Sequence, residues 1–135
     1  MCVSFSLAML LFSTEIYCIH FSLVAGTAVW KIASTPYGNN LVIDVAKQAL
    51  INEKMGSDNI TDLLAVSFSS PDYIGHSFGP NAWETLDGYV KLDEILADFF
   101  SFLDKQVGKD NYTVFLTADH AVANIPAYAK KHKIP

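Results

Sequence analysis

The chain has 135 residues, of which 51% are hydrophobic and 17% are charged, and its formal net charge is −5. This length and apolar content exclude a multidomain assembly and extensive disorder, and they suit one domain or part of one. The sequence contains fourteen acidic residues, nine lysines and no arginine, which argues against a protein that reads nucleic acid through a basic face.

Residues 1–29 form an apolar lead-in, and residues 1–17 are rich in Phe, Leu and Ser. This stretch could act as an export signal or a short membrane anchor. It lacks the positive charges that normally begin a signal peptide, and Glu15 and His20 interrupt the run of about 18 apolar residues that a membrane span needs. We therefore expect contact with a membrane only if the lead-in is a genuine signal or anchor. The alternative is a mistranslated or atypical lead-in to a fragment.

From residue 30 onward the pattern is typical of an α/β domain, and the sequence suggests a domain over residues 30–135. A turn at residues 35–40 precedes a predicted helix with apolar residues at helical spacing from Leu41 to Leu50, which ends near Gly56. Residues 62–68 are almost continuously apolar, which predicts a strand that is buried on both faces, as in a parallel sheet. The polar, glycine-containing residues 69–80 predict a loop.

The longest predicted helix follows this loop. Asn81 and Glu84 resemble a capping box, and an apolar stripe then runs from Leu86 to Leu103. Gly108 closes the helix, and residues 112–117 predict a second buried strand. Strand, loop, helix and strand form a βαβ unit, in which the two strands are expected to be parallel neighbours.

Two Asp–His pairs follow the two predicted strands: Asp72 with His76, and Asp119 with His120. Ligands of open α/β sheets bind beyond the carboxyl ends of the parallel strands, so we expect the pairs to converge at one edge of the sheet. Carboxylate oxygen and imidazole nitrogen are suitable zinc ligands, but each pair supplies only two of the three or four that zinc needs. On the residues alone, solvated loop side chains and a surface imidazole remain an alternative.

The sequences SSPDYIGHSFGP at residues 69–80 and FLTADH at residues 115–120 resemble the metal-binding segments of the alkaline phosphatase superfamily. The similarity is strongest to its type I phosphodiesterase/nucleotide pyrophosphatase group and to bacterial alkaline phosphatases of the same build. The resemblance covers about residues 30–135. It implies a fragment of a three-layer α/β/α fold with a mainly parallel sheet, and a partial metal-binding catalytic domain.

The resemblance also implies a two-zinc phosphoester hydrolase that acts on a small-molecule substrate in the periplasm or outside the cell. Asp72 and His76 would bind one Zn²⁺, and Asp119 and His120 the other. The Thr or Ser nucleophile and another Asp ligand are expected upstream and a further His ligand downstream, so this chain would contain no nucleophile and be inactive alone.

The family usually has Gly after the Asp-His pair, where this chain has Ala121. If that position needs a positive φ, Ala would be strained there by about 1 kcal/mol or more. Two alternative functions remain. One is a non-catalytic divalent-metal-binding or structural fragment, and the other is a sulfatase or phosphomutase of the same superfamily, which the identity of the nucleophile would decide.

Overall fold

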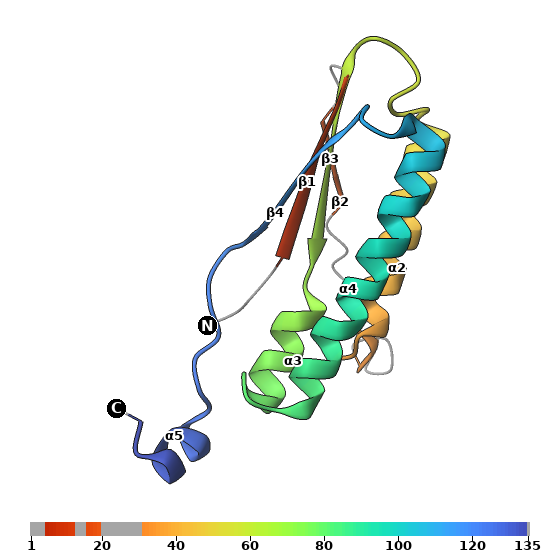
Figure 1. The fold of residues 1–135 in the computed structure, drawn as a ribbon. Helices are drawn as coiled ribbons and strands as arrows, with labels where there is room; N and C mark the ends of the chain where they lie inside the picture. The colour runs from red at the N-terminus through yellow and green to blue at the C-terminus, as the bar shows by residue number, and fades with distance from the viewer. Residues whose placement is uncertain (1–4, 13–15, 20–30, 135) are drawn as a thin grey trace.

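The computed structural model describes residues 5–12, 16–19 and 31–134, which form an α/β fold (Figure 1). A four-stranded sheet is covered on one face by two long helices that lie side by side, α2 (Tyr37–Asn52) and α4 (Trp83–Leu103). The predicted α/β class is confirmed. The layer of helices lies over β3, so the core forms between that strand and the two helices.

The sheet has the strand order β2-β3-β1-β4. Its strands are β1 (Phe5–Phe12), β2 (Ile16–Ile19), β3 (Thr61–Phe68) and β4 (Thr113–Ala118). Strand β1 pairs antiparallel with both β3 and β4, and β2 pairs parallel with β3. Strands β3 and β4 therefore run in the same direction, as predicted, but the prediction that they are neighbours is wrong because β1 lies between them.

Strands β1 and β2 both belong to the apolar lead-in, which thus contributes two strands to the sheet. The rest of residues 1–29 lies outside the described residues, and the role of this stretch as a signal or anchor stays a prediction. Within the ranges that the structure describes, no helix is both long enough and apolar enough to span a bilayer.

Strand β3 is the best-covered strand. Its residues alternate between buried and half-buried, with Leu64, Val66 and Phe68 in the core. The prediction of burial on both faces is not met, because the described helices cover one face only. The core cluster also contains buried residues of the helices and of the turn after α2: Val42, Ile43, Ala46, Leu50, Met55, Leu92, Leu96, Phe99 and Leu103.

Helices α2 and α4 confirm the two predicted helices, but α4 begins differently from the prediction. Its N-cap is Ala82, and no side chain caps it. The amide of Asn81, predicted to be the cap, instead donates a hydrogen bond of 2.7 Å to Oδ1 of Asn124. A short π-helix, η1 (Asp104–Gly108), continues α4 to Gly108, whose φ of 101° suits a glycine.

The predicted loop at residues 69–80 is largely a helix, α3 (Ser70–Phe78). Proline in the first turn of a helix loses no hydrogen bond, so Pro71 is compatible with the start of α3. Asp72 in the same turn interacts favourably with the positive end of the helix dipole. The loop prediction was wrong because it rested on the polar, glycine-containing composition of residues 69–80. Pro71 lies in the first turn of α3, where it is tolerated, and Gly75 is buried in a close contact.

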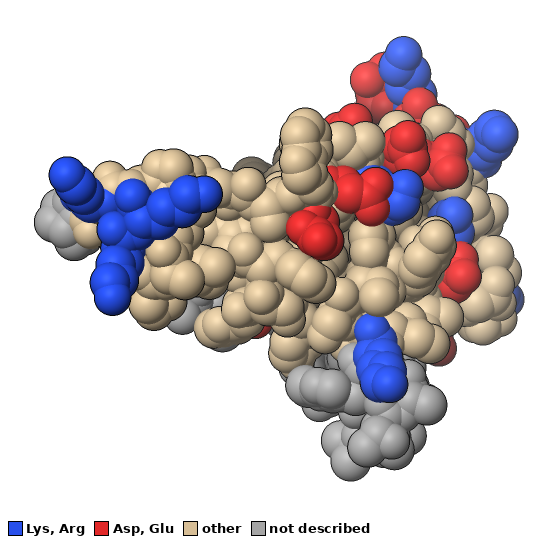
Figure 2. Space-filling view, turned by 90° about the horizontal axis from the view of Figure 1, so that it is seen from below, with Lys and Arg blue, Asp and Glu red and all other residues tan. Residues whose placement is uncertain are grey.

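Strand β4 was predicted to be buried, and the structure shows that five of its six residues are exposed. It lies at the edge of the sheet, away from the helix layer (Figure 1). Beyond β4 the chain reaches α5 (Pro126–His132), which lies apart from the helix layer and carries basic residues in its last turn. Figure 2 shows a group of lysine side chains at one end of the molecule, while acidic side chains gather over another part.

Candidate functional site

The two Asp–His pairs begin at the same edge of the sheet. Phe68, the last residue of β3, and Ala118, the last residue of β4, both pair with Phe5 of β1. The two strand ends are therefore level and separated by two interstrand spacings, or about 10 Å. Asp119 follows β4 directly, and Asp72 lies in the first turn of the helix that follows β3.

Helix α3 brings Asp72 and His76 together. Residues four apart in a helix lie on the same face, and Nε2 of His76 is 3.6 Å from Oδ1 of Asp72. The Asp72 side chain is 11% exposed, whereas His76 is about half exposed. The pair thus has a sheltered carboxylate and an imidazole that solvent or a ligand can reach.

Asp119 and His120 form the second pair in the extended segment after β4. Nε2 of His120 is 3.4 Å from Oδ2 of Asp119, and the His120 backbone N–H donates to Oδ1 of Asp119 at 3.0 Å. Nδ1 of His120 lies 3.3 Å from the carbonyl oxygen of Ala121. The carbonyl can only accept, so the tautomer with its proton on Nδ1 would hydrogen-bond here, and its Nε2 could then bind a cation placed between the ring and Asp119.

Ala121 is not strained. The described residues with a positive φ do not include it, so the conditional expectation of strain at this position is not met. The backbone after the Asp-His pair is therefore compatible with a side chain, and Ala121 gives no reason to doubt the placement of His120.

The two pairs are linked by packing between the end of α3 and the segment after β4. Gly75 lies so close to Val122 that an added Cβ would be 3.3 Å from its methyl carbon. The hydrogen bond between Asn81 and Asn124 joins the same two segments. No local sequence pattern predicts the hydrogen bond between Asn81 and Asn124, because the two residues are 43 positions apart.

Two cavities open beside the histidines. One of about 230 Å³ is lined by His76 and Val122, and one of about 400 Å³ is lined by His120, Val122 and Tyr89. Burial raises the pKa of the Tyr89 hydroxyl above its ordinary value of 10.0, so this group stays protonated near neutral pH. Each histidine therefore borders a space that a small ligand could enter.

The structure assembles the two pairs but does not join them into one centre. Within residues 5–12, 16–19 and 31–134, no three His, Cys, Asp or Glu side chains gather so that they could hold a metal ion. The intervening strand β1 is the physical reason, because it separates the ends of β3 and β4. The two Asp–His pairs therefore lie at the same edge of the sheet, as expected, but among the described residues they do not form one cluster.

The donor atoms of each pair nevertheless fit zinc. A tetrahedral Zn²⁺ with ligand bonds of about 2.0–2.1 Å separates its donors by about 3.4 Å. The observed separations are 3.6 Å and 3.4 Å, each between a carboxylate oxygen and an imidazole nitrogen. Each pair thus offers half of a tetrahedral ligand set.

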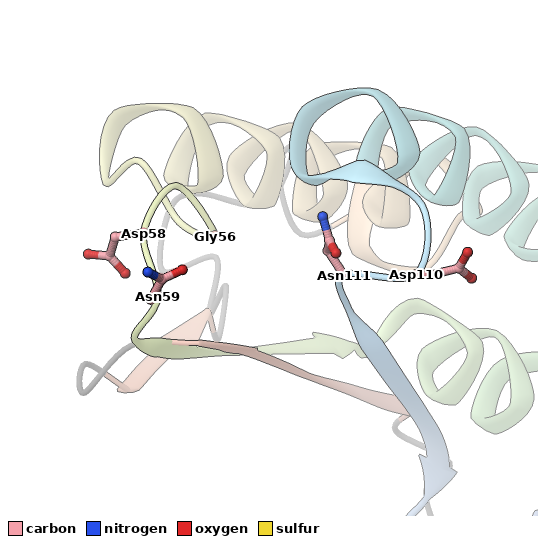
Figure 3. A pocket seen from close by; sticks show the side chains of 5 residues that line it. All are labelled: Gly56, Asp58, Asn59, Asp110 and Asn111. Atoms are coloured by element: carbon pink, nitrogen blue, oxygen red, sulfur yellow. The ribbon is translucent and has the colours of Figure 1, made fainter.

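A polar cavity of about 410 Å³ lies near the start of β3 and β4 (Figure 3). The two Asp–His pairs follow the other ends of these strands. The cavity is lined by Gly56, Asp58, Asn59, Asp110 and Asn111. In Figure 3 the carboxylates of Asp58 and Asp110 point away from each other, so they do not form a common cation site. These two aspartates are useful controls for the Asp–His pairs.

Comparison with known proteins gives consistent matches. The profile of the type I phosphodiesterase / nucleotide pyrophosphatase family matches residues 21–135, so the similarity begins slightly before residue 30. The chain is 51% identical over 104 residues to alkaline phosphatase PafA of Elizabethkingia meningoseptica, a match that covers 77% of this chain and 19% of that protein. It is 50% identical over 104 residues to alkaline phosphatase PhoV of Synechococcus elongatus, with the same shares covered.

The crystal structure of wild-type alkaline phosphatase PafA matches with a TM-score of 0.71 and 47% identity, over 77% of this chain and 20% of that one. The chain therefore spans about a fifth of the length of the relatives that it matches.

Proposed function

Because the chain belongs to the type I phosphodiesterase/nucleotide pyrophosphatase family, we propose that it is part of the catalytic domain of a two-zinc phosphoester hydrolase. The observation that carries the proposal is the pair of Asp–His contacts of 3.6 Å and 3.4 Å at the level ends of β3 and β4. Carboxylate–imidazole pairs in this arrangement have the donor chemistry and the spacing that zinc prefers.

Asp72 and His76 would hold one zinc ion, and Asp119 and His120 the other. When bound, the two ions offset the negative charge of the phosphoryl group and activate the attacking oxygen. Within this chain, a hydrogen bond from Nδ1 of His120 to the Ala121 carbonyl, 3.3 Å away, would orient the imidazole and present Nε2 to the ion. Helix α3 does the same for His76 by holding it one turn from Asp72.

This chain spans about a fifth of the relatives' length. We expect the remaining parts of the site, a Thr or Ser nucleophile and the missing zinc ligands, to lie in the part that it does not span. Two donors per ion cannot complete a zinc site, so we expect no measurable turnover from the 135-residue chain alone. The proposed substrate is a small-molecule phosphoester, and the proposed location is the periplasm or the outside of the cell.

Hydrolysis of p-nitrophenyl phosphate tests the proposal. A chimera of PafA should carry this chain's residues in place of the matched 104-residue segment, which the 51% identity makes feasible. We expect zinc-dependent hydrolysis by the chimera, lowered by at least about 100-fold in His76→Ala or Asp119→Ala, because each change removes a direct metal ligand.

Asp58→Ala is the matched control, because Asp58 is an exposed aspartate of the distant cavity and should leave the rate unchanged. A folded chimera whose rate is insensitive to His76→Ala and Asp119→Ala would refute the assignment. Hydrolysis by the isolated chain that those two variants abolish would refute the proposal that the chain is incomplete.

A further inference from the structure

The segment after β4 carries the second Asp–His pair without regular secondary structure. Residues 119–125 lie between β4 and α5 and form neither a helix nor a strand. Asp72 and His76, by contrast, are fixed by the helix that contains both of them. The backbone of residues 119–125 therefore needs contacts with another element if Asp119 and His120 are to keep their place.

Helix α3 and the turn after it supply such contacts through two glycines. Gly75 and Gly79 are both buried and lie one helical turn apart. A Cβ added at Gly75 would be 3.3 Å from a methyl carbon of Val122. A Cβ added at Gly79 would be 3.2 Å from a methyl carbon of Ile125. The absence of side chains at these glycines therefore lets the extended segment lie directly against α3.

A hydrogen bond between side chains completes this contact. Nδ2 of Asn81 donates to Oδ1 of Asn124 at 2.7 Å. The turn that carries Asn81 is itself held in place, because the buried hydroxyl of Thr85 donates to the Gly79 carbonyl at 2.7 Å. The N–H of Gly79 in turn donates to the Gly75 carbonyl at 2.8 Å. Asn81 thus reaches the segment after β4 from a turn whose backbone is fixed.

We propose that Asn81 and Asn124 are positioning residues, which hold the second Asp–His pair at a fixed place relative to the first. Asn124 lies four residues after His120, in the same irregular segment. The sheet connects the two pairs only through β1, whereas this hydrogen bond connects their own segments directly. The inference rests on the proposed function in that the two pairs are taken as zinc ligands, but the hydrogen bond can be tested without zinc.

A double-mutant cycle in the full 135-residue chain tests the hydrogen bond. Asn81→Asp and Asn124→Asp each leave one amide opposite one carboxylate, so that a hydrogen bond can still form in either single variant. The double variant has two carboxylates and no donor between them, so the side chains repel each other. We expect hydrogen exchange of amides 119–125 to change by no more than about twofold in each single variant and to accelerate at least about fivefold in the double variant.

Asn52→Asp with Asn59→Asp is the matched control, because it adds the same charge at two exposed asparagines near the other end of β3. This control should leave the exchange of amides 119–125 unchanged. Circular dichroism verifies that all variants fold. No acceleration in the double variant, or an acceleration equal to the product of the two single effects, would overturn the proposal.

Zinc binding by the PafA chimera tests the positioning role. Two chimeras are compared, each of which retains one Asp–His pair while the other pair is changed to alanine. Competition with a chelator should show that Asn81→Asp with Asn124→Asp weakens zinc binding at Asp119 and His120 at least about fivefold. Binding at Asp72 and His76 should weaken by no more than about twofold, because α3 holds that pair.

Equal weakening at the two pairs would indicate a general loss of structure and would overturn the positioning role. Unchanged zinc binding at Asp119 and His120 would overturn it as well. Chimeras that bind no zinc at either pair would refute the proposed function, and the positioning role with it. The exchange measurement in the isolated chain separates that outcome from a failure of the hydrogen bond itself.

Discussion

Strands β3 and β4 end at the same level of one sheet, and an Asp–His pair follows each, yet their surroundings differ. The inward side chains of β3, such as Leu64 and Phe68, are fully buried beneath α2 and α4. In β4, Phe115 and Leu116 are more than half exposed. Both strands are apolar, so the comparison teaches that an apolar run predicts a strand, while its burial depends on what the rest of the protein packs against it.

The largest expected difference between the two strands is in the free energy of unfolding. Leu64→Ala should lower it by about 3 kcal/mol, because the change removes buried methyl groups and leaves a cavity. Leu116→Ala should lower it by no more than about 0.5 kcal/mol, because the side chain is mostly in water. Urea unfolding followed by circular dichroism measures both, and equal losses would contradict the contrast.

The junction between α2 and the helix after β3 should be the next most sensitive place. A Cβ added at Gly38 would overlap Oγ of Ser70 and lie 3.1 Å from the Ile32 carbonyl oxygen. Gly38→Ala should therefore lower the free energy of unfolding by about 1–3 kcal/mol. Adding Ser70→Gly should recover part of this loss, and a double variant no more stable than Gly38→Ala would show that the Ser70 contact is not the cause.

Removal of residues 1–12 should affect the local stability of β4 more than that of β3. β4 would lose β1, its only partner among the described strands, whereas β3 would keep β2 and the helix layer. We expect hydrogen exchange of the β4 amides to accelerate by about tenfold or more, with a smaller change in β3. Hydrogen exchange measured by mass spectrometry tests this, and equal acceleration in both strands would contradict the topology.

The smallest expected effect is a pH dependence at the start of β4. Burial, with a hydrogen bond of 2.7 Å to Asp104, raises the pKa of Tyr112 to about 12. In the unfolded chain the pKa is about 10, so the folded state holds its proton more tightly. This stabilisation is fully present below about pH 10 and is lost as the pH rises toward about 12.

Tyr112→Phe should remove this part of the fall in stability between about pH 10 and 12, measured as the difference from the original chain in urea unfolding. Asp104→Asn should lower the pKa of Tyr112, because it replaces a charged acceptor with a neutral one. The same pH dependence in the original chain and in Tyr112→Phe would show that Tyr112 is not its source.

Periodicity and strand composition predicted α2, α4, β3 and β4, because each of these elements carries its own hydrophobic pattern. Helix α3 was missed because the polar, glycine-containing composition of residues 69–80 is typical of a loop, whereas the structure places Pro71 in a first turn and Gly75 at a close contact. The strands of the lead-in were missed because an apolar run of that length is also compatible with a signal or an anchor.

In the candidate site, too, contacts between residues close in the sequence could be predicted, and features that depend on distant residues could not. The contact between Asp72 and His76 follows from their spacing of four, and Asp119 and His120 are neighbours in the chain. The separation of the two pairs could not be predicted, since it depends on β1, a strand from a distant part of the chain. The hydrogen bond between Asn81 and Asn124 could not be predicted either, because neither residue lies in a motif that indicates contact with the other.

We propose that each Asp–His pair holds its own zinc ion, and the zinc content of the PafA chimera tests this proposal most directly. Mass spectrometry of the metal should give two zinc ions per chain, and the same number in the control with Asp58→Ala and Asp110→Ala. The double variant Asp72→Ala with His76→Ala should keep one ion, and Asp119→Ala with His120→Ala should also keep one. Two ions retained in either double variant would contradict the claim.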